Sequence, residues 1–328
     1  MAHANISIFV PHMGCSNMCS FCNQRFIAGT EVIPDENTVK NAVLTAIDSK
    51  NYNPDLTEIA FFGGSFTAID KDYMVRLLSA AYEFVGAKQV SGIRISTRPD
   101  AIDENILSIL KTYGVTAIEL GAQSMDDEVL ALNDRGHTAE CVEKASLLIK
   151  QYGFSLGLKM MTGLYGDTDE KALTTAQKII DLKPDTVRIY PTIVLQNTRL
   201  AALYEANVYN PQTLEQAVKL VSELLLIFKQ NNIKVIRTGL HSIDTSKFVA
   251  GPWHPAFKEL CDANIYLKKA LSLLKNKGDY IIYVPVRDIS KMTGQKRKNI
   301  EILKQKGFNC VVKEDSNLKE YEIYLQGM

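Results

Sequence analysis

Three cysteines near the amino end constrain this chain more than any other feature. Cys15, Cys19 and Cys22 have the spacing Cys-x3-Cys-x2-Cys and follow closely on an apolar run at residues 6–10. Three thiolates on one short loop can point at one metal centre with an open coordination position, whereas a closed structural zinc site takes four ligands. His12 precedes the loop, but no fourth cysteine or nearby histidine completes a set of four. The spacing therefore predicts an iron–sulfur cluster with one iron left free, and zinc or chance spacing are the alternatives.

Composition narrows the class of protein. The chain has 328 residues, long enough for one large α/β domain and a small appendage. Lys+Arg and Asp+Glu both number 37, so the zero formal net charge gives no overall attraction to phosphate polymers, although a local basic patch stays open. We find no apolar run long enough to span a bilayer and no cleavable leader. Six cysteines, three of them clustered, indicate a reducing compartment, so we expect a cytoplasmic protein without a membrane partner.

Strand and helix signals alternate along the chain, which predicts an α/β fold with a parallel sheet. Six strands are expected, at residues 6–10, 58–62, 93–97, 117–120, 156–160 and 187–190. Asp70 is expected to cap one of the intervening helices, and Asn210-Pro211 to start another. Six strand–helix units suit an incomplete (β/α)6 TIM-like barrel over residues 1–275, whose chemistry lies at the carboxyl ends of the strands.

Candidate binding residues follow the second and third strands. Gly63 and Gly64 allow close backbone approach to a ligand, or form a simple tight turn. Arg98 and Asp100 are either ligand contacts or a cap and a surface pair.

Further candidates follow the fourth and fifth strands. Gln123 is a polar residue at a strand end and needs partners if it is buried. Arg135 can meet a carboxylate with two parallel hydrogen bonds, although Arg135 and His137 can equally form a loop salt bridge or a helix cap. Lys159 lies within an apolar strand, and burial favours the barrel mouth for its side chain over an outward, snorkelling path.

The cysteine spacing is the signature of the radical S-adenosylmethionine (SAM) superfamily, which this chain resembles. Taken together, the segments after the strands resemble one branch of it, the radical SAM domain of the Elongator catalytic subunit. The resemblance covers roughly residues 5–240, and its matched segments are residues 63–67, 97–100, 119–124, 135–138 and 189–192.

The resemblance implies cofactors and roles. The three cysteines would hold a [4Fe-4S] cluster whose fourth iron chelates SAM, and one electron from a flavodoxin or ferredoxin would cleave SAM to a 5′-deoxyadenosyl radical. Gly63 and Gly64 would contact the methionine end of SAM, and Gln123 and Arg135 its ribose or carboxylate. Ser65 and Thr97 would be further cofactor-binding residues. Lys159 and Tyr190 would line the substrate side.

That family modifies the wobble uridine of tRNA at carbon 5 with acetyl-coenzyme A. The residues that follow the barrel are too few for its acetyltransferase-like domain, and its basic leader is missing before the cysteines. The resemblance therefore does not carry the acetyl-coenzyme A step over to this chain.

Residues 276–328 predict a small separate α/β domain. A strand at 280–285, helices at 289–292 and 298–306, and two further strands resemble a KH RNA-binding module, in which a Gly-x-x-Gly loop clamps the nucleic-acid backbone. Here Gly294 opens the loop and Arg297 replaces the second glycine. Predicted RNA contacts are Gly294 and a compact cation patch of Lys291, Lys296, Arg297 and Lys298. The alternative is a small α/β cap with a solvated basic helix end.

Three functions follow from these features. The first is a radical SAM enzyme that modifies a base in RNA, either tRNA or rRNA. The second is a radical SAM enzyme acting on a small molecule or peptide. The third is a non-catalytic iron–sulfur RNA-binding protein, which would leave the Gly-Gly, Gln123 and Arg135 motifs unexplained.

Overall fold

The computed structural model describes residues 3–10, 15, 19–22, 33–240 and 243–328. His12 and the residues between Cys15 and Cys19 lie outside these ranges. No helix in the described ranges is long and apolar enough to cross a membrane.

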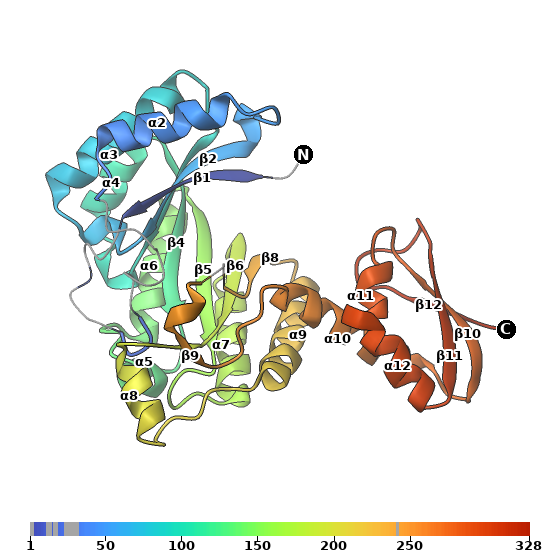
Figure 1. Cartoon of the computed structure of the whole chain (residues 1–328). Helices are drawn as coiled ribbons and strands as arrows, with labels where there is room; N and C mark the ends of the chain where they lie inside the picture. Colours follow the sequence, from blue (N-terminus) through green and yellow to red (C-terminus); the bar gives the residue numbers. More distant parts are fainter. Residues whose placement is uncertain (1–2, 11–14, 16–18, 23–32, 241–242) are drawn as a thin grey trace.

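A curved parallel sheet of seven strands forms the larger part of the molecule (Figure 1). Its spatial order is β1-β2-β3-β4-β5-β6-β8, and every neighbouring pair is parallel. The strands are β1 (Ala4–Val10), β2 (Thr57–Gly63), β3 (Gly92–Thr97), β4 (Val115–Gln123), β5 (Ser155–Thr162), β6 (Thr186–Pro191) and β8 (Lys234–Thr238). The predicted partial barrel is confirmed. All six expected strands are present, and β8 is a seventh that the sequence did not reveal, because only Val235 and Ile236 in it are apolar.

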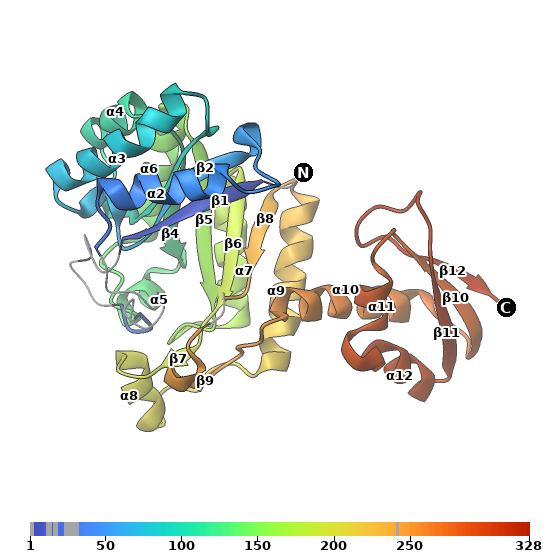
Figure 2. The same ribbon diagram turned by 45° about the horizontal axis from the view of Figure 1, so that its top comes forward.

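Six helices pack on one face of this sheet (Figures 1 and 2). They are α2 (Glu36–Ile47), α3 (Lys71–Gly86), α4 (Glu104–Thr112), α6 (Ala139–Gln151), α7 (Asp169–Asp181) and α9 (Leu214–Gln230). The hydrophobic core lies between these helices and the strands, where residues such as Leu77, Ile95 and Leu158 are almost fully buried.

Helix starts follow side-chain caps. Asp70 caps α3 as predicted, since its carboxylate accepts a hydrogen bond from the Tyr73 amide at 2.9 Å. The predicted start at Asn210-Pro211 is wrong, because α9 begins at Leu214. Thr213 and Gln216 form a reciprocal capping box there, at 3.2 and 2.8 Å, which satisfies two amides at the helix start.

Strand alternation makes the opposite face of the sheet polar. In β3, Ile93 and Ile95 face the helices, and Arg94 between them faces the inside of the curve. In β5, Leu158 and Met160 face the helices in the same way, and Lys159 faces inward. The concave side, called the lumen below, therefore carries charged residues.

Smaller elements lie near the carboxyl ends of the strands. Helix α5 (Asp127–Leu132) follows β4, and α8 (Arg199–Glu205) follows the short strand β7 (Val194–Leu195), which pairs with β9 (Phe248–Ala250). A second apolar cluster forms here around Val194 and Leu200, and Phe21 from the cysteine region packs against it.

A small α/β unit forms the tail, as predicted. It contains β10 (Gly278–Val284), α11 (Ile289–Thr293), a 3-10 turn at Gln295–Arg297, α12 (Lys298–Gln305), β11 (Phe308–Glu314) and β12 (Tyr324–Gly327). β10 is the central strand, parallel to β11 and antiparallel to β12.

Helix α10 (Phe257–Leu273) joins the two parts, packing against both α9 and α11. Buried hydrogen bonds fix the tail to it, from the hydroxyl of Tyr266 to Asp288 and from that of Tyr321 to Asp262, both at 2.5 Å. Figures 1 and 2 show the tail on the far side of α9 from the barrel sheet.

Candidate functional site

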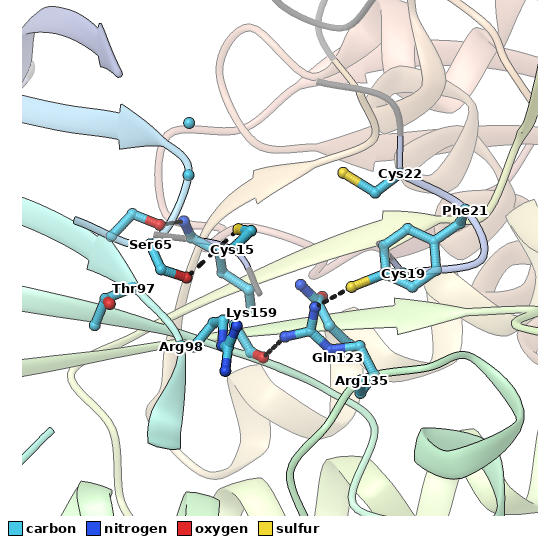
Figure 3. Close-up of a pocket in the computed structure, with 14 residues that line it drawn as sticks. Cys15, Cys19, Phe21, Cys22, Ser65, Thr97, Arg98, Gln123, Arg135 and Lys159 are labelled. Carbon is cyan, nitrogen blue, oxygen red and sulfur yellow. Dashed lines mark hydrogen bonds between the residues drawn. The ribbon is translucent and has the colours of Figure 1, made fainter. Parts of the chain in front are cut away.

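A cavity of about 190 Å³ lies where the carboxyl ends of β2 to β5 meet the cysteine region (Figure 3). Eleven of the fourteen residues around it were singled out from the sequence. The lining residues are Cys15, Cys19, Phe21, Cys22, Gly63, Gly64, Ser65, Ser96, Thr97, Arg98, Gly121, Gln123, Arg135 and Lys159. Segments up to 144 residues apart in the chain therefore share one cavity, as the barrel topology requires.

All three cysteines reach this cavity. Figure 3 shows Cys15 on the side of Ser65, whose hydroxyl lies 3.7 Å from the Cys15 sulfur, with Cys19 and Cys22 opposite. Burial, together with the neighbouring thiols of Cys19 and Cys15, raises the pKa of Cys22 to about 12. A thiol with a raised pKa becomes a thiolate when a cationic metal centre compensates its charge.

The spread of these thiols bears on the kind of centre. Among the residues that the structure describes, no three His, Cys, Asp or Glu side chains are grouped closely enough to hold one metal ion. Three cysteine sulfurs around one cavity suit an iron–sulfur cluster, which protein thiolates hold. Cysteine donors without a histidine or carboxylate are also the set that iron–sulfur clusters use.

Ser20 anchors the cysteine region, and sequence reasoning missed it. Its hydroxyl donates to the side-chain oxygen of Asn133 at 2.6 Å, and its amide donates to the Asn133 carbonyl at 3.1 Å. Its own carbonyl accepts from the Leu200 amide at 2.7 Å. Asn133 completes the anchor by donating to the carbonyls of Val129 and Tyr165. A serine between two cysteines gives no signal of such a role, because its partners lie over 100 residues away.

Gly63 shows why glycine is needed at the end of β2. It has φ +113°, and a Cβ there would lie 2.5 Å from the Val10 carbonyl oxygen. The next amide, that of Gly64, donates to this same oxygen at 2.9 Å. The glycine pair therefore brings β1 and β2 close together, and it also opens the backbone toward the cavity beside Ser65.

Gln123 presents an unsatisfied acceptor. It ends β4 in the left-handed region at φ +65°, and its side-chain oxygen is buried without a hydrogen-bond partner in the described structure. A buried amide oxygen of this kind is costly unless a donor meets it. A ribose hydroxyl would satisfy it, which fits the SAM contact that the sequence predicted for this residue.

Arg135 is buried beside the cysteines. One terminal nitrogen lies 2.9 Å from the Cys19 sulfur and the other donates to the Gly121 carbonyl at 2.8 Å. These contacts place its charge against a predicted cluster ligand, a position the sequence did not indicate. His137, two residues on, is buried, and burial first and the Arg135 charge second lower its pKa to about 4, so it is neutral near pH 7.

Thr97 and Arg98 line the cavity while binding neighbouring loops. The Thr97 hydroxyl lies 2.6 Å from that of Thr67, which also reaches the Ala101 carbonyl at 2.6 Å. Arg98 pairs with Asp100 through two hydrogen bonds, one of them 2.9 Å from Nε. The side chains after β2 and β3 thus hold one another in place at the cavity wall.

Lys159 points into the cavity (Figure 3). This is the orientation toward the barrel mouth that the sequence predicted. Its ammonium hydrogen-bonds to Ser96 and lies 3.3 Å from a Glu119 carboxylate oxygen. Burial lowers the pKa of Lys159 below its usual range. Tyr190 is not brought to this cavity. It is half-buried on β6, next to Arg188.

Comparison with known families identifies the class. The model of the Radical SAM superfamily matches residues 9–179, and that of the Radical_SAM C-terminal domain matches residues 184–269. With the cysteine set and the partial barrel, these matches show that the chain belongs to the radical SAM superfamily. That membership implies, in general, a [4Fe-4S] cluster and SAM, which the three thiols and the open acceptor of Gln123 fit.

Within this superfamily the chain is similar to Elongator-type proteins, as predicted. It is 29% identical over 185 residues to the tRNA uridine(34) acetyltransferase of Methanocaldococcus jannaschii, covering 50% of this chain and 34% of the relative. It is 31% identical over 196 residues to human Elongator complex protein 3, covering 54% and 36%. The chain thus matches only about a third of the length of these relatives.

A solved structure shows the same fold. The Elp3 protein of Methanocaldococcus infernus, with residues 1–46 deleted, superposes with a TM-score of 0.67 at 22% identity. The match covers 82% of this chain and 64% of that one.

Proposed function

We propose that this protein is a radical SAM enzyme that modifies a base in RNA, either tRNA or rRNA. The observation that carries the proposal is the shared cavity, in which three thiols, the open acceptor of Gln123 and Lys159 converge at the strand ends. Relatives named as tRNA uridine(34) acetyltransferases support RNA as the substrate class.

Each residue has a role in this proposal. Cys15, Cys19 and Cys22 hold the cluster, while Gln123 accepts a hydrogen bond from the SAM ribose. When bound, the cluster and SAM supply reductive cleavage to a 5′-deoxyadenosyl radical, with the electron coming from a flavodoxin or ferredoxin. Gly63, Gly64, Ser65 and Thr97 form part of the cavity wall that binds SAM. The barrel excludes water from the reacting groups.

The experiment that tests this function is mass spectrometry of RNA nucleosides from cells with and without the gene. We expect one modified nucleoside to disappear without the gene and to return with the wild-type gene, but not with a Cys19→Ala copy. Identical nucleoside profiles in both strains, for tRNA and rRNA alike, would refute RNA modification.

A radical SAM enzyme acting on a small molecule or peptide is the second candidate, because the formal net charge of the chain is zero. SAM cleavage that depends on a metabolite extract and not on RNA would favour it.

The tail is proposed as the RNA-binding part. Its loop joins α11 to α12, as the loop of a KH module joins two helices. Lys296 and Arg297 are exposed there with φ of 52° and 62°, backbone conformations that cost about 1 kcal/mol or more for such residues. Lys291 is not included among the proposed RNA contacts, because it is ion-paired with Asp288 at 2.6 Å. Gly294, Lys296, Arg297 and Lys298 remain as the proposed contacts.

We expect Arg297→Gln in the full chain to weaken tRNA binding several-fold and to reduce its dependence on salt, since one phosphate contact is lost. Filter binding at two salt concentrations measures both effects. Lys313→Gln, on β11 of the same tail, is the matched control and should bind like the wild type. If the wild type, Arg297→Gln and Lys313→Gln bind tRNA equally well, this loop does not bind RNA.

A further inference from the structure

A row of three cations crosses the lumen beyond the cavity. The strand register places Lys159 of β5 directly opposite Arg188 of β6, and Arg188 directly opposite Arg237 of β8. Residues opposite each other on neighbouring strands point to the same face, with Cβ atoms about 5 Å apart. Like charges at that separation repel and destabilise the sheet, so such a row needs compensation.

Carboxylates among the described residues neutralise only some of the positive charge of this row. Glu119 is its one carboxylate, 2.7 Å from Arg188 and 3.3 Å from Lys159. Arg94 also reaches that carboxylate, at 3.4 Å. Arg237 has no carboxylate partner among the described residues, and its Nε donates to the Gly239 carbonyl at 3.2 Å.

The second lumen carboxylate, Glu58, is engaged elsewhere. It accepts from Arg94 at 2.8 Å, from Thr116 at 3.0 Å and from His3 at 2.8 Å. The described lumen therefore has four cations, Arg94, Lys159, Arg188 and Arg237, against two carboxylates. Uncompensated charge inside a protein is costly, so a bound anion would stabilise this group of cations.

The row is positioned to hold a ligand next to the cavity. Lys159 at one end lines the cavity with the cysteines and Gln123. Lys159 and Arg188 both lie over the Phe62 ring, at 5.6 and 5.2 Å from its centre, which fixes them on one side. The Nε of Arg188 is buried without a hydrogen-bond partner in the described structure. Tyr190, one position along the same face of β6, adds a hydroxyl beside Arg188.

We propose that Lys159, Arg188 and Arg237 form a subsite for an oxyanion of the substrate, a phosphate or a carboxylate. Guanidinium groups bind both oxyanions through paired hydrogen bonds, and an ammonium adds a third charge. The bound anion supplies the missing negative charge and holds the rest of the substrate toward the cavity. This assignment rests on the proposed function only in calling the ligand a substrate.

The test is calorimetric titration of the full-length, cluster-reconstituted protein at constant ionic strength, with sodium phosphate, sodium acetate and uridine 5′-monophosphate as probes. We expect the wild type to bind at least one of them. Arg237→Gln should weaken that binding about tenfold or more, because a charge-assisted contact is lost. Arg237→Lys, which keeps the charge, should have a smaller effect. Arg76→Gln, an exposed arginine on α3, is the control and should bind like the wild type.

Thermal unfolding in the absence of anion gives a second readout. Arg237→Gln removes a repulsive charge, so its melting temperature should equal or exceed that of the wild type, whereas an arginine needed only for structure would lower it. Preference for phosphate and the nucleotide would indicate a nucleotide phosphate, and preference for acetate a carboxylate on a small molecule.

No binding of any probe, or binding that Arg237→Gln leaves unchanged, would overturn the subsite. These titrations need neither RNA nor turnover. If the protein binds an anion at this subsite but no modified nucleoside depends on the gene, RNA modification alone is refuted. If a modified nucleoside depends on the gene but the protein binds no anion, the subsite alone is refuted.

Discussion

The Cys19→Ala protein is expected to assemble no stable [4Fe-4S] cluster and to cleave no SAM above background. Cys19 is one of only three thiols around the cavity, and two cysteines leave the cluster without enough protein ligands. The loss should appear together in iron and sulfide content, in visible absorption and in 5′-deoxyadenosine formed by the anaerobic, chemically reduced protein. Arg135 would also lose its contact with the Cys19 sulfur.

Cys141→Ala is the matched control. Cys141 lies on α6, is partly buried and does not line the cavity, so its variant should keep full iron content and SAM cleavage. Normal iron content in Cys19→Ala, or zinc in the wild-type protein purified anaerobically, would contradict the cluster assignment.

The candidate site could largely be predicted because its parts are local motifs at strand ends. Cys15, Cys19 and Cys22 are close in sequence, and Gly63 and Gln123 each follow an apolar run directly. In a parallel barrel such ends meet at one edge, so order along the chain is enough to group them. The same rule placed Lys159 at the cavity, because a lysine within an apolar strand must face the polar side.

Contacts between distant residues could not be predicted in this way. Arg135 reaches Cys19 across 116 positions of sequence, and nothing in either motif specifies that pair. The row of Lys159, Arg188 and Arg237 depends on the register of three strands, one of which was not recognised. A one-residue slip would turn Arg237 toward the helices, so no local pattern could show it opposite Arg188.

The tail shows a different limit of prediction from sequence. Its strand and helix positions follow the apolar pattern closely, yet the positive φ of Lys296 and Arg297 has no signal in their residue types, since glycine or asparagine is usual there. Burial of Asp262 and Asp288 against tyrosine hydroxyls, which fixes the tail to α10, likewise depends on tertiary packing.

Lys159→Ala is expected to separate SAM cleavage from product formation. The cysteines and Gln123 come from β4 and the amino-terminal region, whereas Lys159 enters the cavity from β5 and continues into the cation row. Its removal leaves Glu119 paired with Arg188 and Arg94, so the buried carboxylate keeps partners and the barrel should fold. We expect 5′-deoxyadenosine formation within about twofold of the wild type and a loss of modified product of roughly a hundredfold, the cost of a misplaced substrate.

Both quantities can be followed in one anaerobic reaction, with chromatography for 5′-deoxyadenosine and mass spectrometry for the modified nucleoside. Lys144→Ala, an exposed lysine paired with Glu140 on α6, is the control and should match the wild type in both. If Lys159→Ala instead abolished SAM binding, Lys159 would belong to the SAM site. The substrate side of the cavity would then begin at Arg188.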